Sequence, residues 1–146
     1  MSSIIFIIKG LKKAQVIIHT NSNGGVSVTY PTGDITIEQV LSKDCPDHAI
    51  IVDESILPQG ADALFFDAWE LNGSTISVNL NKAKANKLTW YNENAIQVAQ
   101  KRQLNTLADI QNTVDDATWS AKLTADRASI ASATTTDELV AIANPA

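Results

Sequence analysis

The residues best suited to chemistry are the one cysteine and the two histidines of the chain. Cys45 and His48 have the spacing C-x-x-H in "CPDH", and His19 could supply a third zinc ligand. A closed zinc site needs four ligands, and nothing in the sequence identifies the fourth. Cys45 precedes Pro46 in a predicted turn, which is a poor position for a nucleophile. We therefore predict no metal, cofactor or catalytic residue, and keep a metalloenzyme built on these three residues as an alternative.

The remaining polar motifs are typical of turns and helix caps. Three pairs of adjacent carboxylates occur, and neighbouring side chains diverge on a strand or lie about 100° apart on a helix. The stretch "NSNGGVS" lacks the Gly-Lys-Thr ending that a phosphate-binding loop requires. The sequence therefore predicts a protein that is not an enzyme. The pairs are Asp53-Glu54, Asp115-Asp116 and Asp137-Glu138.

The charge of the chain argues against nucleic acid as a partner. The net charge is −5, and residues 1–80 hold four Lys or Arg against nine Asp or Glu. A general nucleic-acid binder needs a basic face. Charged residues make up only 18% of the chain, which mildly favours a subunit of an assembly. The apolar run Ile4–Ile8 is too short to span a bilayer, so we expect no membrane insertion and synthesis in the cytoplasm.

The residues that must position any site fall into two regions, and we expect an α+β fold. Residues 1–80 contain all six Gly and short β-branched runs, which predict a small antiparallel β domain made of hairpins. Asn72-Gly73 predicts a two-residue type I′ turn. A short helix is expected at residues 36–43, with Asp34 or Thr36 as its cap. Strands are expected at residues 4–8, 14–20, 26–30, 49–53, 64–71 and 74–80.

Residues 81–146 form the second predicted domain, a helical tail with helices at about 81–112, 115–133 and 136–143. Asn81 is the expected cap of the first helix, and Thr135 with Glu138 forms a capping box for the last. Six residues of the first helix and the segment after it recur at three- and four-residue spacing along one narrow face. A stripe with so few apolar residues cannot stabilise a long helix alone. We therefore expect the helix to lie on the β domain, on copies of itself or on a partner. The six are Ile96, Ala99, Gln103, Leu107, Ile110 and Val114.

One order of features resembles a known family. "VSVTYPTGDITIEQVLSKDCPDHAIIVDESILP" is followed by "DALFFDAWELNGSTISVNLNKAK", and the chain closes with "IASATTTDELVAIANP". This combination resembles small bacteriophage proteins encoded beside tail-fibre genes, many of them tail-fibre assembly or tail assembly chaperone proteins. Cys45 stands where that family has an apolar residue.

The resemblance implies a non-enzymatic phage tail protein, a structural or accessory subunit of the tail fibre or baseplate, located in the virion. A tail-fibre assembly chaperone that leaves before the particle is complete is one alternative, and a carbohydrate-binding tail module is another. The expected partners are other tail or fibre proteins, or further copies of this chain.

Two groups of residues are the expected partner contacts. Trp90 and Tyr91 form an aromatic pair, and aromatic residues dominate interface energetics. Ile4, Phe6 and Ile8 form an apolar strand that a hairpin of residues 3–9 with 14–20 would contain. That hairpin is either core or an arm that adds to a neighbouring subunit's sheet.

Overall fold

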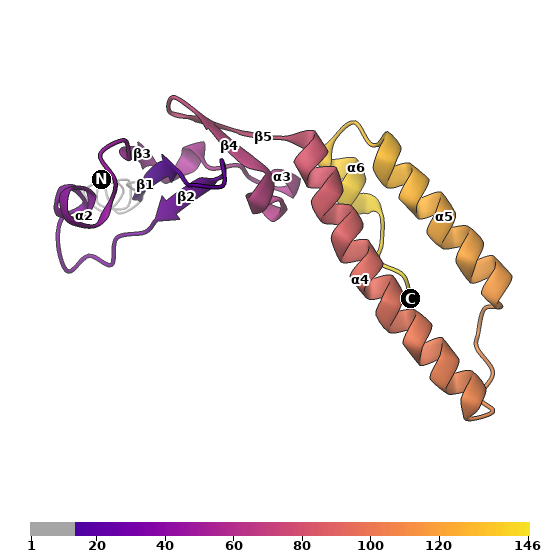
Figure 1. The fold of residues 1–146 in the computed structure, drawn as a ribbon. Coiled ribbons are helices and arrows are strands. Elements are labelled where there is room, and N and C mark those ends of the chain that lie inside the picture. The colour runs from indigo at the N-terminus through magenta and orange to yellow at the C-terminus, as the bar shows by residue number, and fades with distance from the viewer. Residues whose placement is uncertain (1–13) are drawn as a thin grey trace, which may run out of the picture. The chain divides into compact units, whose positions relative to one another are not determined.

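The structure, a computed structural model, describes residues 14–146 (Figure 1). The α+β class is confirmed, because strands occupy the first part of the chain and long helices the second. The chain divides into two compact units between Val78 and Asn79. We call the described residues up to Val78 the β unit and residues 79–146 the helical unit.

A three-stranded antiparallel sheet forms the centre of the β unit. Strand β1 (Gln15–Thr20) lies between β2 (Val26–Thr29) and β3 (Ile50–Asp53), so the order is β2-β1-β3. Successive residues of a strand point to opposite faces, and β1 is buried on both. Val16 and Ile18 belong to one hydrophobic cluster, whereas Ile17 belongs to another. This double burial explains the continuous apolar run "VII".

Helix α2 (Ile37–Asp44) supplies the second of these clusters through Val40. The predicted cap is confirmed at Thr36, whose hydroxyl accepts from the Gln39 backbone N–H at 3.2 Å. The Gln39 side chain in turn accepts from the Thr36 N–H at 2.8 Å, which completes a capping box.

The strand predicted at residues 64–71 is wrong over most of its length. Short helical turns occupy that stretch, namely α3 (Ala61–Leu64) and η2 (Phe66–Ala68), and only β4 (Trp69–Asn72) is extended. The turns satisfy their own backbone groups locally, and the Trp69 indole N–H donates to the Asp62 carbonyl at 2.9 Å. Trp69 is therefore a core residue that fixes the turns, together with Leu57 after the short turn η1 (Glu54–Ile56).

The second hairpin exists, but its turn lies one residue later than predicted. Strand β4 pairs with β5 (Thr75–Val78), and Asn72 is opposite Thr75. The connecting residues are Gly73 and Ser74, and Gly73 has a φ of 63°. Asn72 and Ser74 are absent from the described residues with positive φ. Positive φ at the first central residue alone is the type II′ pattern, so the predicted type I′ turn is wrong.

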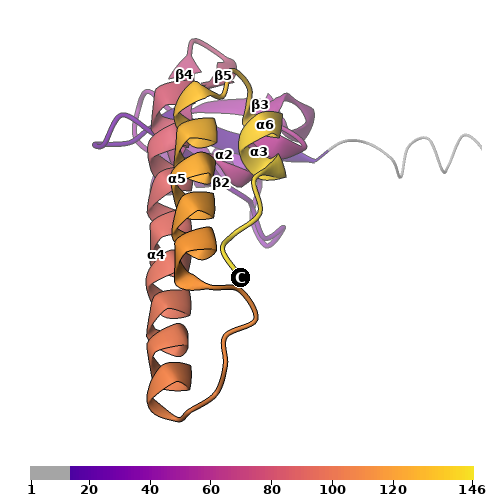
Figure 2. The ribbon, with the colours of Figure 1, turned by 90° about the vertical axis from the view of Figure 1, so that its right-hand side faces the viewer.

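Three helices form the helical unit: α4 (Leu80–Leu107), α5 (Asp116–Ser132) and α6 (Thr136–Ala141). Figure 2 shows α4 and α5 side by side, with α5 the shorter. Asn79 caps α4 by accepting from the Lys82 N–H, so the predicted cap at Asn81 is wrong. Asp115 caps α5. Thr135 caps α6 as predicted, but the Glu138 side chain accepts from the Thr134 N–H rather than the Thr135 N–H, so the predicted capping box is only half formed.

Helix α4 ends at Leu107 rather than near residue 112 because Asp109 adopts a left-handed backbone with φ 60°. The Ile110 N–H donates to the Asn105 carbonyl, and the Asp109 N–H donates to the Thr106 carbonyl. These two bonds form a Schellman motif, which usually uses glycine at the left-handed position. The absence of glycine there explains why the end was not predicted.

The predicted strand with Ile4, Phe6 and Ile8 lies outside the described residues. Its expected partner, residues 14–20, contains β1, which is paired with β2 on one edge and with β3 on the other, so the predicted hairpin along residues 14–20 is wrong. Among the described helices, none combines the length and apolarity that crossing a bilayer requires.

Candidate partner-binding groove of the helical unit

The structure separates the two members of the predicted aromatic contact. Trp90 and Tyr91 are successive residues of α4, so their side chains leave the helix about 100° apart. Trp90 is 37% exposed, whereas Tyr91 is fully buried. Tyr91 is therefore a core residue, and the prediction that it contacts a partner is wrong. Trp90 stays a predicted contact.

Tyr91 instead joins α4 to α5 through a buried polar interaction. Its hydroxyl donates to Asp126 Oδ2 at 2.6 Å, and Lys122 Nζ donates to both oxygens of the same carboxylate at 2.8 and 3.0 Å. Burial raises the pKa of Tyr91, and the bond to Asp126 raises it further. Burial also opposes ionisation of Asp126, but the hydrogen bonds from Lys122 and Tyr91 outweigh it and lower its pKa.

Lys87 connects α4 to the segment after α6. Its ammonium group donates to the Ile142 carbonyl at 2.6 Å. Burial lowers the pKa of Lys87, and the nearby Asp126 carboxylate opposes that effect. A buried lysine is a candidate nucleophile in other settings. Here the ammonium group donates to a backbone carbonyl, so we assign Lys87 a structural role in the helical unit.

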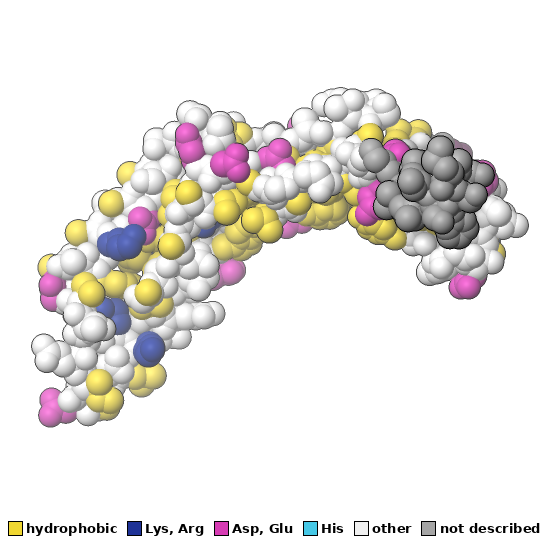
Figure 3. All heavy atoms as spheres, turned by 180° about the vertical axis from the view of Figure 1, so that it is seen from behind, with side chains coloured by type: hydrophobic (Ala, Val, Ile, Leu, Met, Phe, Trp, Pro, Cys, Tyr) yellow, Lys and Arg dark blue, Asp and Glu magenta, His cyan; other side chains and the backbone are white. Residues whose placement is uncertain are grey.

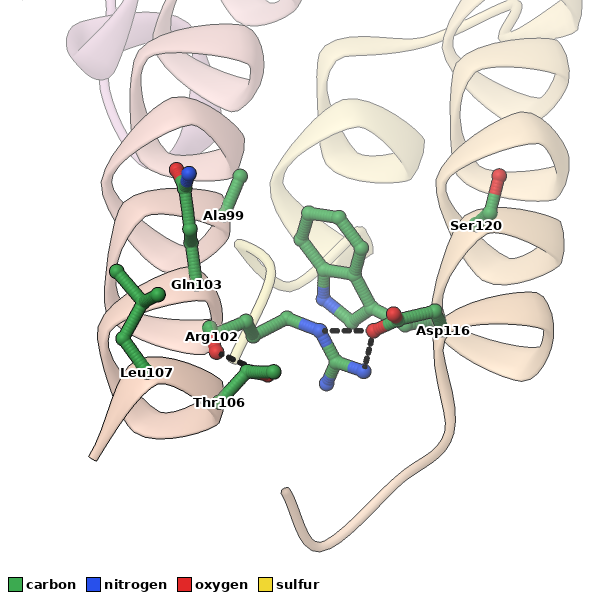
Figure 4. Close-up of a pocket in the computed structure, with 8 residues that line it drawn as sticks. Ala99, Arg102, Gln103, Thr106, Leu107, Asp116 and Ser120 are labelled. Carbon is green, nitrogen blue, oxygen red and sulfur yellow. Dashed lines mark hydrogen bonds and ion pairs between the residues drawn. The ribbon is translucent and has the colours of Figure 1, made fainter. Parts of the chain in front are cut away.

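Arg102 connects the end of α4 to the start of α5 (Figure 4). Its guanidinium forms an ion pair with Asp116, with Nε 3.2 Å from Oδ1, and donates from Nη2 to the Val114 carbonyl at 2.7 Å. The same group lies over the Trp119 ring, 5.1 Å from its centroid. Arg102 thereby fixes the loop between the two helices and the first turn of α5.

A groove of about 440 Å³ lies between α4 and α5 beside this arginine. Ala99, Gln103 and Leu107 line it from α4, and Ser120 lines it from α5 (Figure 4). Trp119 of α5 lines it as well. The lining is mainly apolar, with charge only where Arg102 meets Asp116. Such a surface suits an apolar side chain of another protein better than a charged small molecule.

The wall of the groove continues into the apolar stripe that the spacing predicted. Ile96 is 59% exposed and Leu107 is 77% exposed, and Ile110 and Val114 are exposed as well. Hydrophobic side chains at the surface of the helical unit are yellow in Figure 3. The buried face of α4 lies on the opposite side and uses Ala83, Lys87, Tyr91 and Ala95. Because α4 ends at Leu107, Ile110 and Val114 lie in the loop, and the helical stripe is confirmed only for Ile96, Ala99, Gln103 and Leu107. The last three line the groove between α4 and α5.

A smaller pocket of about 250 Å³ lies on the other side of Trp119. Tyr91, Leu123 and Thr118 line it, together with Pro145 and Ala146 from the segment after α6. Tyr91 contributes a hydroxyl that is already bonded to Asp126. We regard this pocket as a packing gap of the helical unit.

The candidate zinc ligands are only partly brought together. The His19 and His48 rings meet edge to face with centroids 5.6 Å apart. His19 Nδ1 and His48 Nε2 each lie 3.1 Å from the Thr20 carbonyl oxygen. Cys45 packs instead with the apolar cluster around Ile17. Within residues 14–146, no three His, Cys, Asp or Glu side chains gather as a metal site would require.

The predicted stripe contains three residues that line the groove, Ala99, Gln103 and Leu107, but the sequence did not indicate the contact beside them. Asp116 was expected only as a turn or cap residue, and its contact with Arg102 spans a loop that is longer than the sequence predicted. Trp119 lies three residues after Asp116, so the helix places both on neighbouring sides of its first turn.

No protein-family model, curated protein or solved structure matches the chain. Membership of the tail-fibre-associated family therefore stays a prediction from the sequence resemblance.

Proposed function

We propose that this chain is a non-enzymatic bacteriophage tail protein, a structural or accessory subunit associated with the tail fibre or baseplate. The order of motifs in residues 25–84 supports the family, and the exposed apolar stripe of α4 supports the mode of action. The stripe and the adjoining groove offer a partner protein an apolar surface next to one charged pair.

The stripe is the observation that carries the proposal. Ile96 and Leu107 are eleven residues apart, which is close to three full helical turns, so both face the same direction. Large exposed apolar patches on soluble proteins commonly mark interaction surfaces. Burying one Leu-sized side chain contributes about 1.5–3 kcal/mol, so Ile96 and Leu107 would each add appreciably to the binding of a partner helix or strand.

Mass spectrometry of purified virions tests the proposal directly. We expect the chain in particles that have been washed free of unassembled protein, at a constant ratio to a major tail protein. Absence from the virion, with the chain still required for fibre assembly, would instead support the chaperone alternative and overturn the subunit role.

A variant pair tests whether the groove makes the contact. Leu107→Asp puts a charge on the groove wall, and Leu64→Asp makes the same change at an exposed leucine of the β unit. We expect both variants to keep their circular dichroism spectra, and only Leu107→Asp to be lost from virions. Retention of both would show that the groove does not bind the partner.

A further inference from the structure

We propose that α4 also pairs antiparallel with α4 of a second copy of this chain. The surface involved consists of Trp90, Glu93, Gln97, Lys101 and Leu104, which we call the Gln97 face. This inference goes beyond the tail function and does not depend on it, because it rests only on the geometry and charge of α4.

The five residues lie on one side of the helix. Their successive spacings are three, four, four and three, so at about 100° per residue they fall within an arc of roughly 80°. Glu93, Gln97 and Lys101 are exposed, Leu104 is 64% exposed, and the proposal uses only the exposed part of the Trp90 ring. From Glu93 to Leu104 the face is exposed along about 16 Å of helix.

The order of the residues is self-complementary about Gln97. A two-fold axis at Gln97 sets each residue opposite the one equally distant on the other side. Glu93 then meets Lys101 of the second copy, and Trp90 meets Leu104 of the second copy. Each such contact occurs twice in the dimer, as an isologous interface requires.

The charges select the antiparallel arrangement. A parallel, in-register pair would place Glu93 beside Glu93 and Lys101 beside Lys101, and like charges repel. The antiparallel pair replaces both repulsions with attractions. A helix from an unrelated partner would have no reason to find this symmetric order, so a second copy is the occupant that the face fits.

Among the described residues, the side chains of Glu93 and Lys101 have no ion-pair partner. This sets Lys101 apart from five basic side chains of the helical unit that have partners within it. Those partnered contacts are Lys84 with the Ala131 carbonyl, Lys87 with the Ile142 carbonyl, Arg102 with Asp116, Lys122 with Asp126 and Arg127 with Asn92.

The Gln97 face is separate from the groove. Ala99, Gln103 and Leu107 point to a different side of α4, so a dimer leaves the groove accessible. The two surfaces can therefore be tested apart, and loss of virion incorporation in Leu107→Asp says nothing about dimerisation.

Charge reversal in the full-length chain tests the proposal by sedimentation equilibrium. Glu93→Lys and Lys101→Glu should each raise the dimer dissociation constant by about tenfold or more, because each puts like charges together at two symmetric positions. The double variant should return close to wild type. Mixing the two single variants should give a heterodimer that is tighter than either homodimer.

The matched control is Lys43→Glu, which changes the same charge on an exposed position of α2 and should leave the dissociation constant unchanged. Circular dichroism checks that each variant keeps its helices. A protein that stays monomeric at the highest soluble concentration would overturn the proposal. So would a dimer that resists both single variants, or one that the double variant fails to restore.

Cross-linking tests the register. In a Cys45→Ser background, Gln97→Cys should form a disulfide-linked dimer under mild oxidation, since the two-fold axis brings this residue against its own copy. Ser129→Cys, exposed on α5, should not cross-link at a comparable rate. Equal cross-linking of both variants would mean collision rather than a defined interface, and would overturn the register.

Discussion

Tyr91→Phe isolates the interaction that joins α4 to α5. The change removes one hydroxyl and keeps the ring, so the packing of the helical unit is preserved. The hydroxyl donates to an ionised carboxylate at 2.6 Å from a fully buried position. Hydrogen bonds to charged groups contribute about 1.5–3 kcal/mol to stability.

We expect the lower part of that range, because Asp126 keeps its two hydrogen bonds from Lys122 when the hydroxyl is gone. A loss of about 1.5–2 kcal/mol, at a urea dependence near 1 kcal/mol/M for a small unit, lowers the midpoint by roughly 1.5–2 M. Ellipticity at 222 nm follows the helical unit and reports this transition.

Tyr30→Phe is the matched control, because Tyr30 is exposed in the β unit and should leave the midpoint unchanged. The reasoning about Asp126 would be refuted by a Tyr91→Phe midpoint equal to that of wild type. Equal losses in both variants would refute it as well, since the effect would then not depend on burial.

Four further outcomes follow from the same structure. Gly73→Val should lower the free energy of unfolding of the β unit by about 1–2 kcal/mol, because a β-branched residue resists positive φ; an unchanged urea midpoint of Trp fluorescence would contradict this. Arg102→Lys should lower the free energy of unfolding of the helical unit by about 1–2 kcal/mol, because lysine cannot reproduce the forked contacts with Asp116 and Val114 or the stacking on Trp119. Thermal unfolding measures this, and Arg127→Lys, which changes a single exposed contact, is the control. The lowered pKa of Asp126 means that its stabilisation is present above its unfolded pKa of about 3.9 and is lost as pH falls through the lower folded value, so Asp126→Asn should flatten the acid limb of the stability curve; an unaltered limb would contradict the assignment. The raised pKa of Tyr91 has the opposite sense, so its stabilisation is complete below about pH 10 and declines as pH rises further, except in Tyr91→Phe.

Local backbone rules predicted much of the fold. Thr36 and Thr135 could be identified as caps because a hydroxyl beside an apolar run satisfies the free N–H groups of a helix start. The stretch before Trp69 could not be predicted in the same way. Its aromatic and apolar residues favour a strand, but the indole bond to the Asp62 carbonyl holds them in short turns. A contact between residues seven apart overrides the local preference.

The site was less predictable than the fold, because it depends on which face of α4 is covered. Periodicity identified the stripe containing Ile96 and Leu107, but periodicity alone does not say what packs against it. The covered face contains Lys87 and Tyr91, whose polar ends would ordinarily be assigned to solvent. Their partners come from residues 126 and 142, which no local pattern connects to them.

Polar residues lie on the covered face of α4 and apolar residues on its exposed face, and the small number of apolar residues in the helical unit explains this arrangement. Burying small and polar residues of α4 requires hydrogen bonds to replace hydrophobic contact. Tyr91 and Arg102 form them with α5, and Lys87 forms one with the segment after α6. The larger aliphatic side chains Ile96, Leu104 and Leu107 are then left on the outside of the same helix. In a chain that functioned alone, burying these aliphatic side chains and exposing the polar ones would raise stability. Their placement instead favours an α4 that is held by polar contacts within the chain and completes its apolar contacts in an assembly.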